Sequence, residues 1–199
     1  MTKLFYIAIA TVVALGLAVP AAWASVPSVD NSTVLWVNLV NDTTAMICPT
    51  GDASYLDVTV KDQFNAPMAG VLVEASFDGA EIYLVSPVSG TTDISGHVNL
   101  MIYGGTDNSA GEQTVTSGTE VTCLGVTLYS NDKDFLSPDM SQAPGSENVV
   151  EALDYGIFAV DWLSFEEGSR SNFNRLCNEA GGECVGGLDY SIFAAHWLH

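Results

Sequence analysis

Apolar and polar residues alternate in short segments over the first two thirds of the chain. Leu56–Val60 alternates strictly, and comparable segments follow at 70–77, 82–85, 97–103, 112–116 and 121–129. A two-residue period bounded by Gly, Pro, Asn and Asp is typical of half-buried β-strands. Because the segments are short and turn residues separate them, the pattern predicts a β-sandwich over residues 30–136.

The C-terminal part, residues 137–199, contains an internal repeat with a helical period. The segment 153–163 recurs as 188–198, with eight of eleven positions identical at an offset of 35. Two short helices are therefore predicted, each starting near an Asp that can cap free N–H groups. We expect them to pack together through a shared apolar core, formed by Leu153, Ile157, Phe158, Trp162, Leu188, Ile192, Phe193 and Trp197. The repeat pairs Asp161 with His196, and this change of chemistry predicts a solvent-facing position.

The first residues have the pattern of an export signal. Lys3 precedes an apolar run over residues 4–19, and residues 22–24 (Ala-Trp-Ala) form a small-x-small cleavage pattern. This order predicts a secretory signal peptide over residues 1–24. An uncleaved membrane anchor is the alternative, but the run is short for a spanning helix and ends at Pro20. We expect an extracellular or cell-surface protein with no membrane span after signal removal.

The chain is strongly acidic, which changes the range of partners. It has 199 residues, 24 Asp and Glu, and 5 Lys and Arg, for a formal net charge of −19. Without residues 1–24, four basic and 24 acidic residues remain, a net charge of −20. Nucleic acid and anionic lipid surfaces are excluded as partners, because both need clustered Lys and Arg.

Four cysteines in an exported chain suggest disulfides. Cys177 and Cys184 are close together in a Gly-rich loop and are expected to form one bridge. Cys48 and Cys123 would then form the other, closing a long loop across the β-rich region. A metal site is the alternative, although Cys-x6-Cys without a nearby His is a poor zinc pattern.

The β-rich segment resembles the bacterial Ig-like repeat of invasin and intimin-type surface proteins. The family's pattern is a strand ending in Asp, a turn with x-Pro-x-x-Gly, a strand, and then Thr-Asp-x-x-Gly before another strand. Here those positions are Asp62, Pro67, Gly70, Thr92, Asp93 and Gly96. The resemblance covers about half of the chain and implies a spacer, a stalk or an adhesive unit.

The C-terminal repeat resembles the dockerin module, in which two EF-hand-like loops each precede a helix. Such loops carry acids or Asn at positions 1, 3, 5 and 9, a β-branched residue at 8 and an acid at 12. Val150 and Asp154 match positions 8 and 12 of the first loop, and Val185 and Asp189 match those of the second. Asp139 would begin the first loop, which then contains an insertion.

The dockerin resemblance implies calcium, which requires roughly six to eight oxygen ligands. The first loop would supply Asp139, Ser141, Glu147, Glu151 and Asp154. The second loop would begin at Asn178 and supply Asn178, Glu179, Glu183 and Asp189, although a Cys177–Cys184 bridge could replace the ion there. The alternative for the acids of both loops is that they only cap the helix and form a solvated acidic loop.

The sequence offers little for catalysis. Its three His residues belong to no Ser-His-Asp, His-Glu-x-x-His, phosphate-loop or nucleotide-binding pattern, so we expect no enzyme. The prediction is a secreted interaction protein with an Ig-like sandwich and a small helical dockerin-like pair, residues 137–199, that binds a cohesin-like or envelope protein. The resemblance implies a setting among extracellular polysaccharide-degrading assemblies.

Two alternative functions remain open at this stage. One is a carbohydrate-binding module that uses aromatic residues on a β face, with candidates Trp36, Tyr55, Tyr83 and Tyr103. The other is a subunit of a surface layer or fibre, in which divalent cations bridge acidic copies.

Overall fold

The structure, a computed structural model, describes residues 25–198 except Asp42, Asp52, Glu112, residues 143–146, Glu167 and residues 178–181. The predicted signal peptide, residues 1–24, lies outside the described residues. In the part of the chain that is described, no helix is both long and apolar enough to cross a bilayer.

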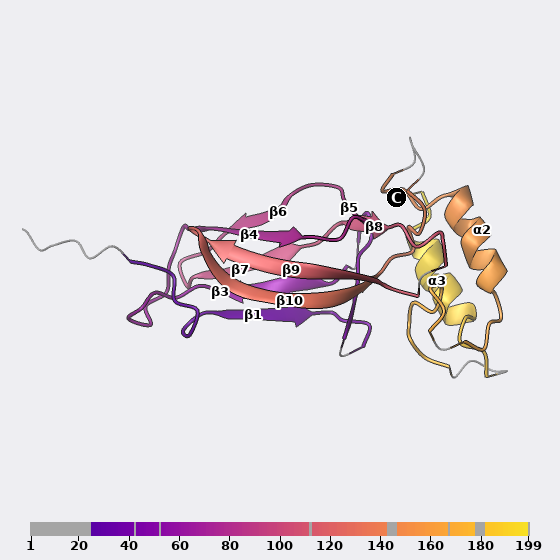
Figure 1. The fold of residues 1–199 in the computed structure, drawn as a ribbon, viewed down its shortest axis with the longest axis horizontal. Helices are drawn as coiled ribbons and strands as arrows, with labels where there is room; N and C mark the ends of the chain where they lie inside the picture. The colour runs from indigo at the N-terminus through magenta and orange to yellow at the C-terminus, as the bar shows by residue number, and fades with distance from the viewer. Residues whose placement is uncertain are drawn as a thin grey trace, which may run out of the picture.

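The β-rich segment folds into two packed sheets and a short two-stranded ribbon (Figure 1). The three-stranded sheet has the order β1-β3-β7, the five-stranded sheet β2-β10-β9-β4-β6, and the ribbon pairs β5 with β8. All pairs are antiparallel except β10 with β2. The strands are β1 (Thr33–Val37), β2 (Thr44–Met46), β3 (Tyr55–Thr59), β4 (Leu72–Phe77), β5 (Ile82–Leu84), β6 (Val88–Thr91), β7 (His97–Met101), β8 (Gly104–Thr106), β9 (Val115–Cys123) and β10 (Val126–Leu136).

The core of the sandwich follows the predicted alternation. Buried and exposed residues alternate along β4 and along most of β9, because successive side chains in a strand point to opposite faces. The inward residues form one apolar cluster that includes Leu56, Val58, Val73, Val121 and Phe135. The predicted mainly β fold, with a small helical part at the C-terminus, is confirmed.

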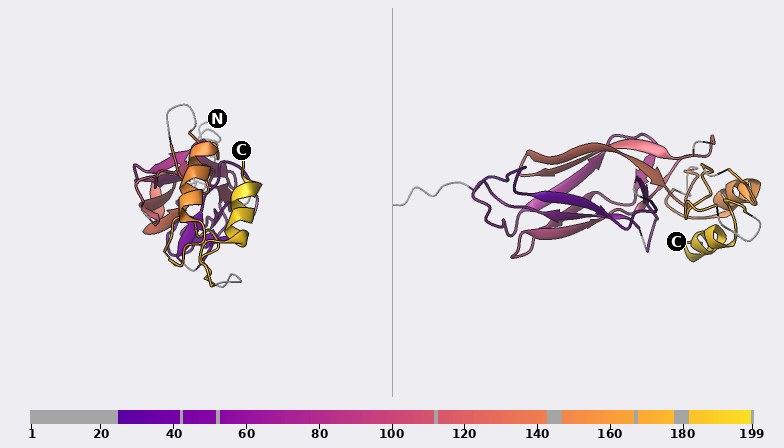
Figure 2. Two further views of the ribbon diagram at one scale, coloured as in Figure 1. Left: turned by 90° about the vertical axis from the view of Figure 1, so that its right-hand side faces the viewer. Right: turned by 90° about the horizontal axis from the view of Figure 1, so that it is seen from below.

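Two helices, α2 (Ala152–Asp161) and α3 (Gly187–Ala195), lie side by side at one end of the sandwich (Figures 1 and 2). They pack through Phe158 and Phe193, whose rings stack with centroids 5.1 Å apart. The two copies of the repeat also exchange equivalent hydrogen bonds. Leu163 N donates to Val185 O at 3.1 Å, and Leu198 N donates to Val150 O at 2.9 Å. The repeat therefore forms an approximately two-fold symmetric pair.

The predicted core of this helical pair is only partly correct. Phe158 and Phe193 are fully buried and the two Ile residues are half-buried, but Leu153, Trp162, Leu188 and Trp197 are exposed. Each helix has fewer than three turns and buries only one narrow face against the partner helix and its loops. The core is instead completed by loop residues, namely Met140, Val150, Phe173 and Val185.

The loops join the helical pair to the sandwich without a spacer. β10 ends at Leu136, and the next four residues, 137–140, are all buried. Thr106 N donates to Asp139 O at 2.9 Å, and Asn108 N donates to Met140 O at 3.3 Å. Met46 packs against the core of the helical pair. The first loop thus continues the hydrogen bonding of the sandwich.

The structure confirms one predicted disulfide and contradicts the other. Cys177 and Cys184 are bonded. Cys123 pairs with Val126 at one end of β10, whereas Cys48 follows the strand that pairs with the other end of β10. About ten extended residues separate these ends, which is roughly 30 Å. Because bonded cysteines need Cα atoms within about 7 Å, the predicted Cys48–Cys123 bridge is wrong.

A non-reducing peptide map tests this assignment. We expect a linked peptide that contains Cys177 and Cys184, and none that links Cys48 to Cys123. Recovery of a Cys48–Cys123 peptide from natively folded protein would contradict the strand register described here.

Candidate functional site

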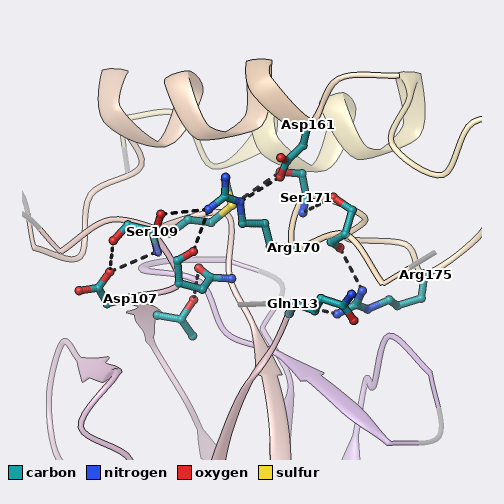
Figure 3. Close-up of polar contacts among 11 residues, drawn as sticks. Asp107, Ser109, Gln113, Asp161, Arg170, Ser171 and Arg175 are labelled. Atoms are coloured by element: carbon teal, nitrogen blue, oxygen red, sulfur yellow. Dashed lines mark hydrogen bonds and ion pairs between the residues drawn. The ribbon is translucent and has the colours of Figure 1, made fainter. Parts of the chain in front are cut away.

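Arg170 connects the helical pair to the sandwich through hydrogen bonds to both (Figure 3). Its Nε donates to Asp161 Oδ2 at 3.0 Å, and its Nη1 donates to the carbonyl oxygens of Asn108 at 3.0 Å and Ser109 at 3.1 Å. Ser171 Oγ donates to the same Asp161 oxygen at 2.7 Å. The Arg170 and Asp161 side chains are largely shielded from water, with 14% and 16% exposure, so salt screens this ion pair less than a surface pair and removal of one partner leaves a shielded charge.

Arg175 makes a second connection of the same kind. Its Nη1 donates to Ser169 O at 3.0 Å, and its Nη2 donates to Gln113 O, beyond β8 in the sandwich, at 3.2 Å (Figure 3). Burial lowers the pKa of the Arg175 guanidinium. Two of the five basic residues in the chain thus lie at this junction.

The position that pairs Asp161 with His196 is not solvent-facing, contrary to the prediction. Asp161 is held by Arg170, and His196 is buried with its Cε1 3.2 Å from where a Gly51 Cβ would lie. The residue types differ because the surroundings differ: Asp161 meets Arg170 and Ser171 of the second loop, whereas His196 lies next to Gly51 of the sandwich. A change of chemistry within the repeat therefore marked two different packing environments, not a free surface.

Asp154 and Asp189 tie each loop to the start of its helix. Asp154 Oδ1 accepts hydrogen bonds from Met140 N and Ser141 N, both at 2.8 Å, and its Oδ2 accepts one from Glu151 N at 2.8 Å. Asp189 accepts from Asn174 N at 3.0 Å and Gly186 N at 3.1 Å. The predicted capping role is confirmed, because each carboxylate satisfies backbone donors at a helix start.

These contacts identify the true start of the second loop. Ser141 N and Asn174 N make equivalent bonds, and Met140 and Phe173 occupy the same core. Asn172 is therefore the equivalent of Asp139, in place of the predicted Asn178, which lies outside the described residues, as does Glu179. The start of the second loop could have been located from a short pattern in the sequence. Both loops begin with Asp or Asn, then an apolar residue, then Ser or Asn, at 139–141 and 172–174.

Asp139 is the most unusual carboxylate of the first loop. Its side chain is fully buried, and neither oxygen accepts a well-formed hydrogen bond. A Cβ on Gly105 would collide with this carboxylate, so only a glycine fits opposite it in β8. Burial is the main reason that the pKa of Asp139 rises to about 7, and burial also raises the pKa of Asp154 to about 6.

The predicted calcium ligands are only partly brought together. Asp139 and Asp154 lie in the same loop, but both oxygens of Asp154 already accept backbone hydrogen bonds. Glu147 is exposed, and Ser141, Glu151 and Glu183 are partly exposed. Among the described residues, no three His, Cys, Asp or Glu side chains converge on one point. Asp139 is the buried carboxylate of this loop that makes no hydrogen bond of good geometry, although the Gln142 amide lies beside it and helps to lower its pKa against the effect of burial.

The outer surface of the helical pair contains two equivalent pockets. One is lined by Tyr155, Phe158, Ala159, Trp162 and Tyr190, with a volume of about 310 Å³. The other is lined by the repeat equivalents Tyr190, Phe193, Ala194 and Trp197 together with Tyr155, with a volume of about 400 Å³. Tyr155 meets Trp197 edge-on at 6.2 Å, and Tyr190 meets Trp162 in the same way at 6.2 Å.

No charged residue is exposed on either helix, both of which are fully described. Asp154, Asp161 and Asp189 are turned inward or paired, and the outward positions are apolar, aromatic, Gly or Ser. We call this surface the apolar tip. Its large exposed side chains, on the helices and immediately after them, are Leu153, Tyr155, Val160, Trp162, Leu163, Leu188, Tyr190, Trp197 and Leu198.

The aromatic residues predicted for a glycan platform are not on an open face. Trp36, Tyr55, Tyr83 and Tyr103 are each half-buried. Trp36 packs edge-on against Phe135, and Lys133 Nζ lies 5.5 Å from the centre of its ring. Exposed aromatic residues gather at the apolar tip instead, where Trp162 and Trp197 were predicted to be core residues and Tyr155 and Tyr190 were not predicted at all.

No protein-family model matches the chain, and no curated protein matches it. Among solved structures, the D00-D0 domain of Intimin is similar, with a TM-score of 0.34 and 19% sequence identity. The match covers 48% of this chain and 46% of that chain, so it spans less than half of each.

Proposed function

We propose that the protein is a secreted, non-catalytic interaction protein that docks to a protein partner through the apolar tip. The observation that carries this proposal is the pair of equivalent aromatic pockets on a surface without exposed charge. Large exposed apolar patches on soluble proteins are typical of interaction sites. Tyr and Trp are also enriched at such interfaces.

A protein partner suits the apolar tip better than a polysaccharide does. A sugar ring can stack on an aromatic side chain, but its hydroxyl groups need several placed polar partners. The apolar tip offers few such groups, namely the hydroxyls of Tyr155, Tyr190 and Ser191 and the indole N–H groups of Trp162 and Trp197. Apolar side chains of a protein would fill the pockets without leaving polar groups unpaired.

The sandwich would serve as a spacer that carries the apolar tip away from the N-terminal end. The connections through Arg170 and Arg175 keep the tip in a fixed orientation. The dockerin-like repeat suggests a cohesin-like or envelope protein as the partner, within an extracellular polysaccharide-degrading assembly. We propose calcium as a ligand of the first loop, where Asp139 would hold it.

Capture experiments with matched variants test the docking proposal. Immobilised chain 25–199 is exposed to envelope and secreted proteins, next to the double variant Ala159→Glu/Ala194→Glu, which places a charge in each pocket. The control is Phe64→Glu/Ile94→Glu, which adds the same charge at exposed positions of the sandwich. We expect the wild type and the control to capture a partner protein and the pocket variant to capture none. Equal capture by all three would rule out the apolar tip as the docking site.

A further inference from the structure

We infer that the apolar tip binds the apolar tip of a second copy of this chain, forming a tail-to-tail dimer. This inference rests on the proposed docking function of the same surface and names an occupant for it. It is argued from the internal symmetry of the tip, from its charge and from its area.

The internal symmetry of the apolar tip gives each copy two sets of the features that a two-fold interface would use. In a two-fold dimer, each contact between a protruding residue of one copy and a pocket of the other occurs twice. Here each copy also carries both features twice, because pockets and ridges on α2 recur on α3. Exposed Leu153 and Leu188 are ridges of a size that enters such pockets. One favourable contact between a Leu ridge and a pocket would therefore occur several times across the interface.

The charge distribution favours contact between copies at this place. The chain without residues 1–24 carries −20, so two copies repel one another over most of their surfaces. The outward faces of α2 and α3 carry no charge, so contact there buries no unpaired carboxylate. The repulsion between the remaining charges is long-range and is screened by salt. The dimer should therefore become tighter as the salt concentration rises.

The area of the apolar tip is sufficient for a dimer. Its large side chains are about half exposed, for example Tyr155 at 50%, Tyr190 at 47% and Leu188 at 53%. Nine such side chains present roughly 900 Å² if a large side chain has about 200 Å² of surface. Stable interfaces bury about 800 Å² per partner, so a dimer that covered all nine side chains would reach that size.

The geometry places the two N-terminal ends far apart in such a dimer. The N-terminal segment is held at the end of the sandwich opposite the helices, where Ser28 N donates to Lys61 O at 2.8 Å (Figure 1). A tail-to-tail pair would therefore be an elongated particle about twice as long as one chain. This shape makes the dimer easy to separate from a compact one by its sedimentation behaviour.

Sedimentation velocity on chain 25–199 tests the inference. We expect wild type to dimerise with a Kd on the order of micromolar, so loading concentrations of about 2 to 100 µM bracket the transition. Raising the NaCl concentration about tenfold should lower that Kd. Ala159→Glu/Ala194→Glu should remain monomeric, while Phe64→Glu/Ile94→Glu, with the same added charge, should dimerise as wild type does.

Two outcomes would overturn the inference. One is a monomeric wild type at the highest concentration in both salts, and the other is a dimer that the pocket variant leaves intact. The first outcome combined with tip-dependent capture of another protein would leave the docking function standing and remove only the self-association. A monomer without any tip-dependent capture would remove both.

Discussion

Replacing Arg170 by Ala is expected to lower the free energy of unfolding by about 3 kcal/mol, since removing one partner of a shielded ion pair leaves the other uncompensated. The change takes away the cationic partner of Asp161, which keeps the hydrogen bond from the Ser171 hydroxyl, and it removes the donor to the carbonyl oxygens of Asn108 and Ser109. For a chain of this size the melting temperature should fall by roughly 6–12 °C. Calorimetry of chain 25–199 measures this shift directly.

Two further variants make the Arg170 prediction specific. Arg170→Lys keeps the charge but loses the forked donor geometry, so it should fall between wild type and Arg170→Ala. Lys61→Ala removes a basic residue whose exposed ammonium bonds only weakly to Asn65, at 3.2 Å, and should change stability by less than about 0.5 kcal/mol. An Arg170→Ala variant that melts like wild type would show that this junction contributes little to stability.

Asp139 is expected to give the protein an inverted pH dependence in the absence of divalent cations. Its pKa of about 7 in the folded chain lies above its unfolded value of 3.8, so the folded state binds more protons between these pH values. Stability should therefore fall as the pH rises from about 4 to about 7, the opposite of ordinary acid denaturation. The raised pKa of Asp154, about 6, acts in the same direction.

Substitution of Asp139 by Asn removes the larger of these two effects. At pH 8 in EDTA we expect Asp139→Asn to be more stable than wild type by about 2–4 kcal/mol, because the buried charge is gone. At pH 4 the two proteins should be nearly equal. Chemical denaturation at both pH values measures the difference. A variant that is less stable than wild type at pH 8 would contradict this account of the first loop.

The same variant separates a structural carboxylate from a calcium ligand. A calcium site saturated about a hundredfold above its Kd should add about 2.7 kcal/mol to wild type. Asp139→Asn should lose this gain, whereas Asp132→Asn, at an exposed position of β10, should keep it. Identical wild-type melts in calcium and EDTA would remove calcium from the first loop. A gain that survives in Asp139→Asn would place the ion elsewhere.

The strands were predictable because their physics is local. Alternation in β3 and β4 requires only that one face of the sheet meets the core, and the sequence displays that directly. The strand pairing was not predictable in the same way. Cys48 and Cys123 looked like natural partners until the register of β10 placed them at its opposite ends. Register depends on contacts between residues distant in the chain, which periodicity does not encode.

The candidate site was harder to predict than the fold, and one residue shows why. Trp162 stands at helical spacing from Phe158, which indicates a core position in any helix with one buried face. The structure buries Phe158 and exposes Trp162, because the partner helix covers only a narrow strip. Spacing located the apolar residues correctly but could not say how wide the covered strip would be.

The long strand β10 also determines how the protein would carry mechanical load. A pull between the N-terminal end and the apolar tip acts along β10, which runs between the hairpin next to Cys123 and the first loop (Figure 1). The hydrogen bonds of an antiparallel pair lie across the strands, so such a pull would strain many β9–β10 bonds at once instead of opening them one by one. The sandwich would thus resist stretching along its length, as a tether between two anchored ends must.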